Sequence, residues 1–173
     1  MFSNNDVNYL LNIDKKVFLD DTLKDEHYLT QKFPFQHKLE LISPSDSDYT
    51  FLYDINQSAK NQFKLTLYLL DSDTRTGLLR IDFNGQHKNP ETITDKVPES
   101  LHAYAGMFFD YNQPHIHYYV EGYKTTLDWA MPLSDNDFPV KQITNSNDII
   151  EAFFKFNQRI NLKTNFVINQ MLL

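Results

Sequence analysis

The sequence has no cysteine and little glycine. The lack of cysteine excludes disulfides, thiol nucleophiles, iron–sulfur clusters and every zinc site that uses Cys ligands. The four glycines, at positions 77, 85, 106 and 122, are too widely spaced for the GxGxxG loop of dinucleotide-binding proteins or for a Walker phosphate loop. No apolar run approaches the length of a membrane span, so we expect no membrane association. Chemistry must therefore depend mainly on polar side chains, including six histidines and ten tyrosines.

Basic residues are outnumbered by acidic ones. Sixteen basic and 23 acidic residues give a net charge of −7, so we expect no general attraction to nucleic acid and no direct DNA binding. The acidity has two interpretations: it keeps the protein in solution, or it docks onto a partner's basic nucleic-acid groove. Residues 75–96 are an exception, because four basic residues outnumber three acidic residues there.

The length and the first residues indicate one domain in the cytoplasm. A chain of 173 residues is long enough for one hydrophobic core, so we expect a single domain over residues 1–173. Met1–Asp6 has neither the basic nor the apolar segment of a signal peptide. With no cysteine to form stabilising disulfides, a cytoplasmic location is the simplest expectation.

Apolar periodicity predicts an α+β fold. A helical spacing indicates an N-terminal helix over about 3–18 and a C-terminal helix over about 147–159. Between them, alternating residues indicate about six strands within about 35–133. The expected strands are 37–42, 49–55, 63–70, 78–83, 114–121 and 127–131. Short connections favour antiparallel neighbours, so we expect an antiparallel sheet with both helices on one face.

Three further segments are not assigned to strands. Asp20–Thr30 is charged and aperiodic, which is typical of a turn. Asn84–Gln113 is a long polar connection, and loops of this length in a compact domain are usually functional or mobile. The tail, residues 165–173, is apolar without a clear period.

The most informative segment is the expected strand at 114–121. Side chains alternate between the two faces of a strand, so four polar residues should share one face. They are His115, His117, Tyr119 and Glu121. A second polar group comes from the strand at 78–83 and the turn after it, and comprises Arg80, Asp82, His87 and Lys88.

These residues support three interpretations. The first is RNA cleavage without metal or other cofactor, in which His87, His115 and His117 supply the general base and the general acid. Arg80 or Lys124 would hold the phosphorane charge, and Tyr119 would bind phosphate or stack on a base. The remaining substrate-contacting residues in this interpretation are Lys88, Lys124 and Asp82.

The second interpretation is a divalent metal site. His115, His117 and Glu121 match the first half of a cupin motif, and these ligands suit zinc, iron or manganese. The glycine-rich second half of that motif has no counterpart here. The third interpretation is structural: a stripe of His and Tyr forms the polar face of an ordinary sheet.

Several of these residues also carry a resemblance, which covers residues 76–156. They are Arg80-x-Asp82, His87-x-Asn89-Pro90, His115-x-His117-x-Tyr119 and Trp129-Ala130. They resemble a small uncharacterised family from bacteria and prophages with Arg-x-Asp, His-x-Asn-Pro and His-x-His-x-Tyr motifs. That setting implies a toxin or a counter-defence protein in the bacterial host cytoplasm. The size and acidity also resemble type II anti-CRISPR proteins.

Combined with the histidine strand, the resemblance leads to one functional expectation and two alternatives. We expect a counter-defence protein that acts on a bacterial RNA-guided nuclease, by histidine-dependent cleavage of its guide RNA. Docking of the acidic surface on the basic nuclease would bring the RNA close. The first alternative is a non-catalytic acidic inhibitor that blocks a basic nucleic-acid groove. The second is a toxin-type RNase that acts on cellular RNA.

Overall fold

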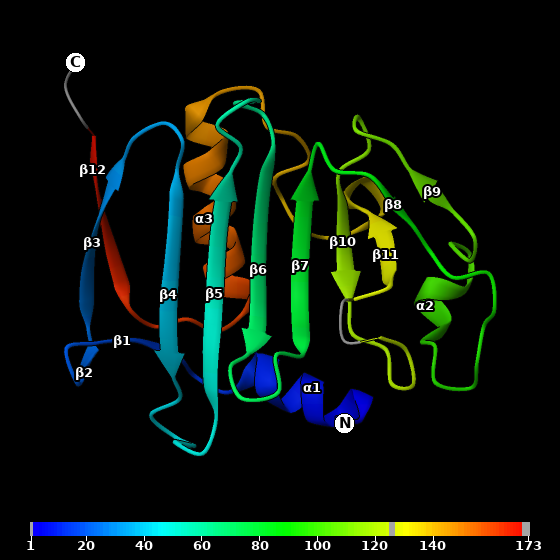
Figure 1. The fold of residues 1–173 in the computed structure, drawn as a ribbon, viewed down its shortest axis with the longest axis horizontal. Helices are drawn as coiled ribbons and strands as arrows, with labels where there is room; N and C mark the ends of the chain where they lie inside the picture. The colour runs from blue at the N-terminus through cyan, green and yellow to red at the C-terminus, as the bar shows by residue number, and fades with distance from the viewer. Residues whose placement is uncertain (1, 125–126, 171–173) are drawn as a thin grey trace.

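The computed structural model describes residues 2–124 and 127–170, which form an α+β fold (Figure 1). Its main sheet is antiparallel and has eight strands, in the order β11-β10-β7-β6-β5-β4-β1-β2. The strands are β1 (Lys16–Leu19), β2 (Thr22–Lys24), β4 (Gln36–Ile42), β5 (Thr50–Gln57), β6 (Leu65–Asp71), β7 (Gly77–Phe83), β10 (His115–Tyr118) and β11 (Trp129–Pro132). The predicted fold class is confirmed, with eight strands instead of about six.

Two small strand pairs flank the main sheet. The parallel pair joins β3 (Glu26–Gln31) to β12 (Asn165–Gln170), and the antiparallel pair joins β8 (His87–Lys88) to β9 (Phe108–Phe109). The described residues also contain a short 3-10 helix at Leu133–Asp135 and three α-helices. These are α1 (Asn4–Asn12), α2 (Glu99–His102) and α3 (Ser146–Arg159). None of the helices in the described part of the chain is long and apolar enough to cross a membrane.

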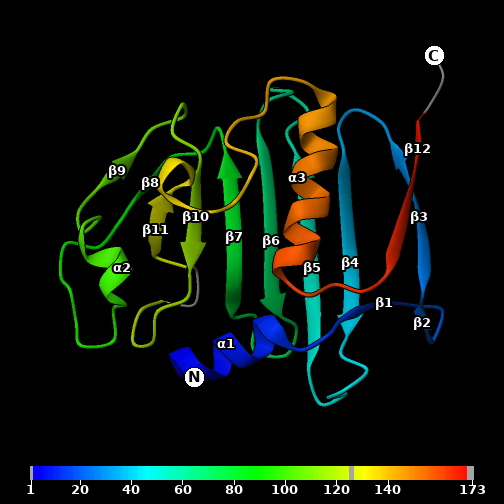
Figure 2. The same ribbon diagram turned by 180° about the vertical axis from the view of Figure 1, so that it is seen from behind.

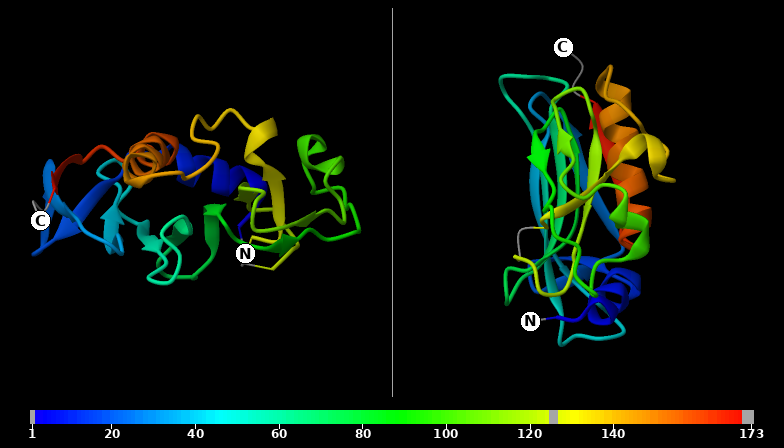
Figure 3. Two further views of the ribbon diagram at one scale, coloured as in Figure 1. Left: turned by 90° about the horizontal axis from the view of Figure 1, so that it is seen from above. Right: turned by 90° about the vertical axis from the view of Figure 1, so that its right-hand side faces the viewer.

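The core lies between the main sheet and the helices α1 and α3, which cover the same face (Figures 2 and 3). Alternate residues of the central strands point into it, as Tyr53, Leu67 and Ile81 do, and all three are fully buried. From α3, Phe153 and Phe156 stack on the ring of Tyr53. The opposite face of the sheet is therefore left to the polar residues of the same strands.

The ends of the chain depart from the predicted element boundaries. The N-terminal helix ends at Asn12 instead of about residue 18, because the chain turns at Ile13 and Val17 pairs with Leu41 of β4. Val17 lies seven residues after Leu10, and this spacing imitates a helical repeat. The main sheet consequently begins at Lys16, well before the predicted residue 35.

Two further differences concern the unassigned segments. The expected turn at Asp20–Thr30 is a turn only at its start, where Asp20 and Asp21 have φ of 52° and 55°; β2 and β3 follow it. The tail forms β12 up to Gln170, and the rest of it lies outside the described residues. The C-terminal helix at 147–159 is confirmed as α3, with Asn145 as its N-cap.

A buried lysine links the two ends of the chain. Lys15 is fully buried, and its Nζ donates to the carbonyl oxygens of Leu11 at 3.2 Å, Ile13 at 2.9 Å and Ile160 at 2.9 Å. The same Nζ lies 4.9 Å from the centre of the Phe51 ring. These carbonyls lie in the last turn of α1 and at the C-caps of α1 and α3, where helices leave carbonyl groups without partners. One ammonium thus satisfies three backbone acceptors and joins the first helix to the last.

We predict that Lys15→Met lowers the free energy of unfolding by about 2–4 kcal/mol, because three buried carbonyls lose their donor while the aliphatic volume is kept. Urea denaturation at neutral pH measures this loss. Lys163→Met is the matched control, since the Lys163 side chain is exposed, and its effect should stay within about 0.5 kcal/mol. Equal stability of the two variants would contradict the proposed role of Lys15.

Candidate functional site

The pairing of β7 with β10 forms a polar cluster on the face of the sheet opposite α1 and α3. Arg80 lies opposite His117 in the antiparallel register, and Asp82 lies opposite His115. Their neighbours Ile81 and Ile116 point the other way, into the core. Four of the predicted site residues therefore meet on two adjacent strands.

The two histidines of β10 are held in one orientation by backbone acceptors. Nδ1 of His115 lies 2.8 Å from the carbonyl oxygen of Gln113, and Nδ1 of His117 lies 2.9 Å from that of Leu127. A carbonyl can only accept, so in both rings Nδ1 carries the hydrogen and donates it. Both side chains are fully buried. In each neutral ring, Nε2 is then a lone pair that faces into the cluster.

Asp82 supplies the third group. Its Oδ2 lies 3.0 Å from Nε2 of His117 and 3.8 Å from Nε2 of His115. Its Oδ1 accepts a hydrogen bond of 2.7 Å from the hydroxyl of Thr66, on β6. One ligand atom from each of Asp82, His115 and His117 lies within 4.8 Å of the others, a spacing that suits one metal ion.

Arg80 closes the cluster toward the surface. Its Nη2 lies 3.0 Å from Nε2 of His117, and its Nε forms an ion pair of 2.9 Å with Oδ2 of Asp82. The guanidinium is thus the cation that these lone pairs share. Its side chain is 24% exposed, against 12% for Asp82, so the cluster reaches solvent mainly through Arg80. Nε2 of His115 stays buried without a hydrogen-bond partner among the described residues.

The pair β8–β9 covers the histidines. The ring centre of His87 lies 4.5 Å from that of His117, and the ring centre of Phe109 lies 4.6 Å from that of His115. Nε2 of His87 lies 2.8 Å from the carbonyl oxygen of Asp128. The three imidazoles that were predicted from separate segments are therefore brought together.

Asn89 anchors this cover to the sheet. Its side chain donates to the carbonyl oxygen of Ala130 at 2.7 Å and accepts from the Ala130 amide at 2.9 Å. It also donates to the carbonyl oxygen of Tyr104 at 2.9 Å. The His-x-Asn-Pro motif thus has a structural basis: the asparagine fixes the turn, and the histidine two residues before it packs on the cluster.

Burial controls the charge of the cluster. It lowers the pKa of His115 and lowers that of His117 to about 3, so both rings are neutral at pH 7. Burial also lowers the pKa of His87. For Asp82, burial favours the neutral acid, but the ion pair with Arg80 and the hydrogen bond from Thr66 outweigh burial and lower the pKa. Asp82 is therefore a carboxylate at neutral pH.

Tyr119 and Glu121 lie outside the cluster, so the expectation that they share a strand face with the histidines is wrong. The strand β10 ends at Tyr118, and the chain bends toward α1. The Tyr119 hydroxyl donates to the carbonyl oxygen of Phe2 at 2.6 Å, and the Glu121 carboxylate lies 3.6 Å from Nζ of Lys96. The carboxylate beside the histidines is Asp82, instead of Glu121.

The two predicted lysines are also elsewhere. Lys88 is exposed on β8 and forms an ion pair of 2.8 Å with Glu91. Lys124 lies in the exposed loop after β10, where its backbone amide donates to Asp128. Sequence analysis also missed Thr66 and Phe109. Thr66 lies opposite Asp82 in the β6–β7 pair, so correct strand pairing is the signal that would have found it.

Comparison with known proteins gives a family but no relative of known function. The model described as "Family of unknown function (DUF6978)" matches residues 2–162. No curated protein and no solved structure matches the chain.

We predict that the metal-free protein loses stability as the pH falls from 6.5 toward 4. The unfolded chain takes up a proton on residue 117 near pH 6.5, whereas the folded chain does so only near pH 3, so the unfolded state binds more protons in this range. His117→Gln should reduce the slope of unfolding free energy with pH by up to about 1.4 kcal/mol per pH unit. Urea denaturation at several pH values, with a chelator present, measures this slope. An unchanged slope in His117→Gln would mean that His117 is already charged in the folded protein.

Proposed function

The chain belongs to the DUF6978 family, whose function is unknown, and we propose that it is a metal-dependent hydrolase of phosphodiesters. The metal ion is held by Nε2 of His115, Nε2 of His117 and a carboxylate oxygen of Asp82. Arg80 is the side chain that binds the phosphate.

One observation carries this proposal: three acceptor atoms converge, and the donor beside them among the described residues is the Arg80 guanidinium. Both Nδ1–H groups are used by backbone carbonyls, so each Nε2 points inward as an acceptor, and Oδ2 of Asp82 is a third acceptor. Histidine ligands of metals commonly donate their second nitrogen in this way, which fixes the tautomer and the ring. The buried, unpartnered Nε2 of His115 is the atom that a hydrogen-bond network alone does not explain.

The ligand set indicates the class of metal. Two imidazoles and one carboxylate suit Zn²⁺, Fe²⁺ or Mn²⁺, and three protein ligands leave a position for water, as in catalytic sites. Such an ion lowers the pKa of its bound water to about 7 and so provides hydroxide at neutral pH. Attack of a water oxygen on phosphorus would form one P–O bond and break the P–O bond to the leaving group, which would take up the proton that the water gives up.

Arg80 has a different partner in each state. Without metal it neutralises Asp82 and bonds to His117. A divalent cation between the ligands repels the guanidinium, and the partly exposed side chain then turns toward solvent. There it can bind the phosphate oxygens of a substrate and stabilise charge in the transition state.

A second candidate is the metal-free RNA cleavage predicted from the sequence. It is favoured by the third imidazole. The ring centre of His87 lies 4.5 Å from that of His117, so one ring could act as base and the other as acid. Its proposed target, an RNA-guided nuclease or the guide RNA, stays a prediction, as do the acidic inhibitor and the toxin-type RNase.

We predict that one equivalent of Zn²⁺ or Mn²⁺ binds to the protein, measured by isothermal titration calorimetry. Asp82→Asn and His115→Gln should weaken binding by about tenfold to 100-fold or more, because each removes or weakens a ligand. Arg80→Gln should bind about tenfold more tightly, because a competing cation is gone.

Two variants test the ligand assignment. Glu121→Gln and Tyr119→Phe remove the groups that the sequence placed on the same face, and both should bind metal as the unmodified protein does. Loss of binding in Glu121→Gln, or unchanged binding in both Asp82→Asn and His115→Gln, would show that the ligands are assigned wrongly.

We predict that the metal-loaded protein hydrolyses bis-para-nitrophenyl phosphate, followed by the colour of the released phenolate. Chelator should abolish the reaction, and Arg80→Gln should slow it on the order of 100-fold despite tighter metal binding. A single-stranded RNA incubated with chelator tests the metal-free candidate. Cleavage of that RNA, lost in His87→Gln, would replace the metal-dependent mechanism with the histidine mechanism.

A further inference from the structure

Charge is unevenly distributed between the two ends of the main sheet. Five segments at one end, at the top in Figure 1, contain no Asp or Glu, and the nearby carboxylates of Asp110 and Asp148 accept hydrogen bonds from Gln86, Thr144 and Asn145; we call this the lysine end. It consists of residues 31–38, 56–66, 83–89, 111–117 and 139–147. Its lysines are Lys32, Lys38, Lys60, Lys64, Lys88 and Lys141. The loops at the other end include acidic residues such as Asp14, Asp46, Asp48, Asp73 and Glu121.

Four of these lysines are available to a ligand. Lys88 is paired with Glu91, and Lys141 donates to the backbone carbonyls of Leu133 and Asn136. The other four form no ion pair or side-chain hydrogen bond among the described residues. A chain of net charge −7 therefore has a locally positive end, where an anionic polymer is attracted while the opposite end repels it.

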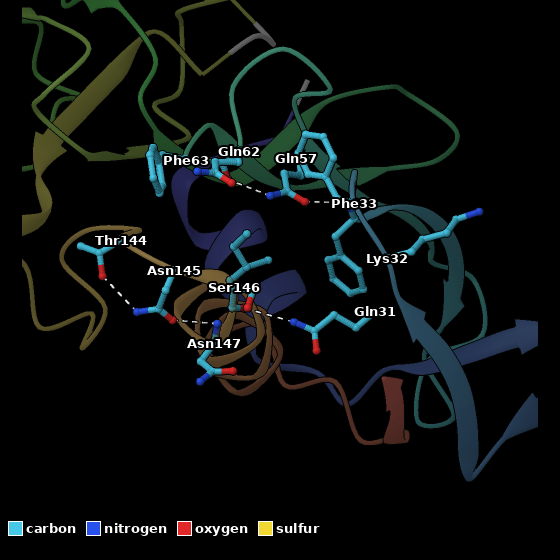
Figure 4. Close-up of a pocket in the computed structure, with 12 residues that line it drawn as sticks. Gln31, Lys32, Phe33, Gln57, Gln62, Phe63, Thr144, Asn145, Ser146 and Asn147 are labelled. Atoms are coloured by element: carbon cyan, nitrogen blue, oxygen red, sulfur yellow. Dashed lines mark hydrogen bonds between the residues drawn. The ribbon is translucent and has the colours of Figure 1, made fainter. Parts of the chain in front are cut away.

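The lysine end contains a groove of about 720 Å³ beside the start of α3 (Figure 4). Phe33 and Phe63 lie on opposite sides of it, and their side chains are 58% and 38% exposed. Exposed phenylalanine rings are costly in water, so an aromatic or apolar partner is expected to cover them. Lys32 lies on the rim.

Unpaired amide groups accompany the two rings. The side chains of Gln62 and Asn147 line the groove and have no hydrogen bond among the described residues. Gln57, which also lines the groove, is held by the amide of Phe35 and the carbonyl oxygen of Gln62, so it fixes the wall. Rings for stacking, amides for base edges and lysines for phosphates are the three parts of a single-strand binding groove.

A second, smaller cavity adjoins the groove. Phe63 also lines a second cavity, of about 200 Å³, together with Tyr111 and Pro114. Tyr111 is 52% exposed and follows the β9 strand that covers the histidines, and Pro114 directly precedes His115. Three exposed aromatic rings thus line the lysine end between α3 and the first residue of β10.

We infer that this groove binds single-stranded RNA. Bases stack on Phe33, Phe63 and Tyr111, and the phosphates lie near Lys32 and Lys64. The inference names the substrate class of the proposed hydrolase and rests on that function for this role of RNA, whereas binding itself needs no metal. The acidic end keeps the chain from binding RNA elsewhere on its surface.

Fluorescence anisotropy with a labelled oligouridine of about 12 nucleotides, in low salt and with chelator, tests the groove. Lys32→Glu and Phe33→Ala should each weaken binding about fivefold or more, through lost phosphate attraction and lost stacking. Lys163→Glu makes the same change of charge near the C-terminal end of α3, and its effect should stay below about twofold.

The inference is overturned if the oligouridine does not bind, if both groove variants bind as well as Lys163→Glu, or if an RNA duplex binds more tightly than the single strand. All the substituted side chains are exposed, so their circular dichroism spectra should match that of the unmodified protein. Binding of RNA without hydrolysis of the small diester would leave the groove in place and remove the hydrolase. Hydrolysis of the small diester without RNA binding would support the hydrolase and remove the RNA-binding groove.

Discussion

The antiparallel register between β7 and β10 is the constraint on which the site depends. It places Arg80 opposite His117 and Asp82 opposite His115, although about 35 residues separate the paired positions in the sequence. A shift by one residue would turn the two histidines into the core and Ile116 out of it. The apolar residues that stabilise the fold therefore also determine the position of the polar residues of the cluster.

The same register explains what the sequence could and could not predict. Alternation gave the strands β4 to β7, the class of the fold and the helix α3, because local periodicity and capping are properties of neighbouring residues. The sequence also singled out His115, His117, Arg80, Asp82 and His87, which the structure brings together in one cluster. It failed for Tyr119 and Glu121, because nothing local shows that β10 ends after four residues. The choice of Asp82 over Glu121 as the carboxylate depends on strand pairing, which a single sequence does not specify.

In the proposed function, the cluster and the lysine end together would let an acidic protein bind a polyanion. Inside the cluster, one guanidinium balances one carboxylate, and two neutral imidazoles add lone pairs without charge. In the proposed function, a divalent cation in place of Arg80 would make the site strongly positive where the phosphate binds. Outside the cluster, the attraction comes from a few lysines on one end only. Net charge alone is therefore a poor guide to what this surface binds.

The tie made by Lys15 has a consequence for the order in which the chain acquires its structure during synthesis. Its third carbonyl partner belongs to Ile160, and the neighbouring amide of Val17 bonds to Thr164. A ribosome that extends the chain from its N-terminus has made the whole main sheet before either partner exists. Until then, the ammonium of Lys15 stays hydrated and the first strand lacks part of its support. The growing protein thus keeps its N-terminal segment loose until residues 160–164 have emerged, which delays closure of the core until α3 is complete.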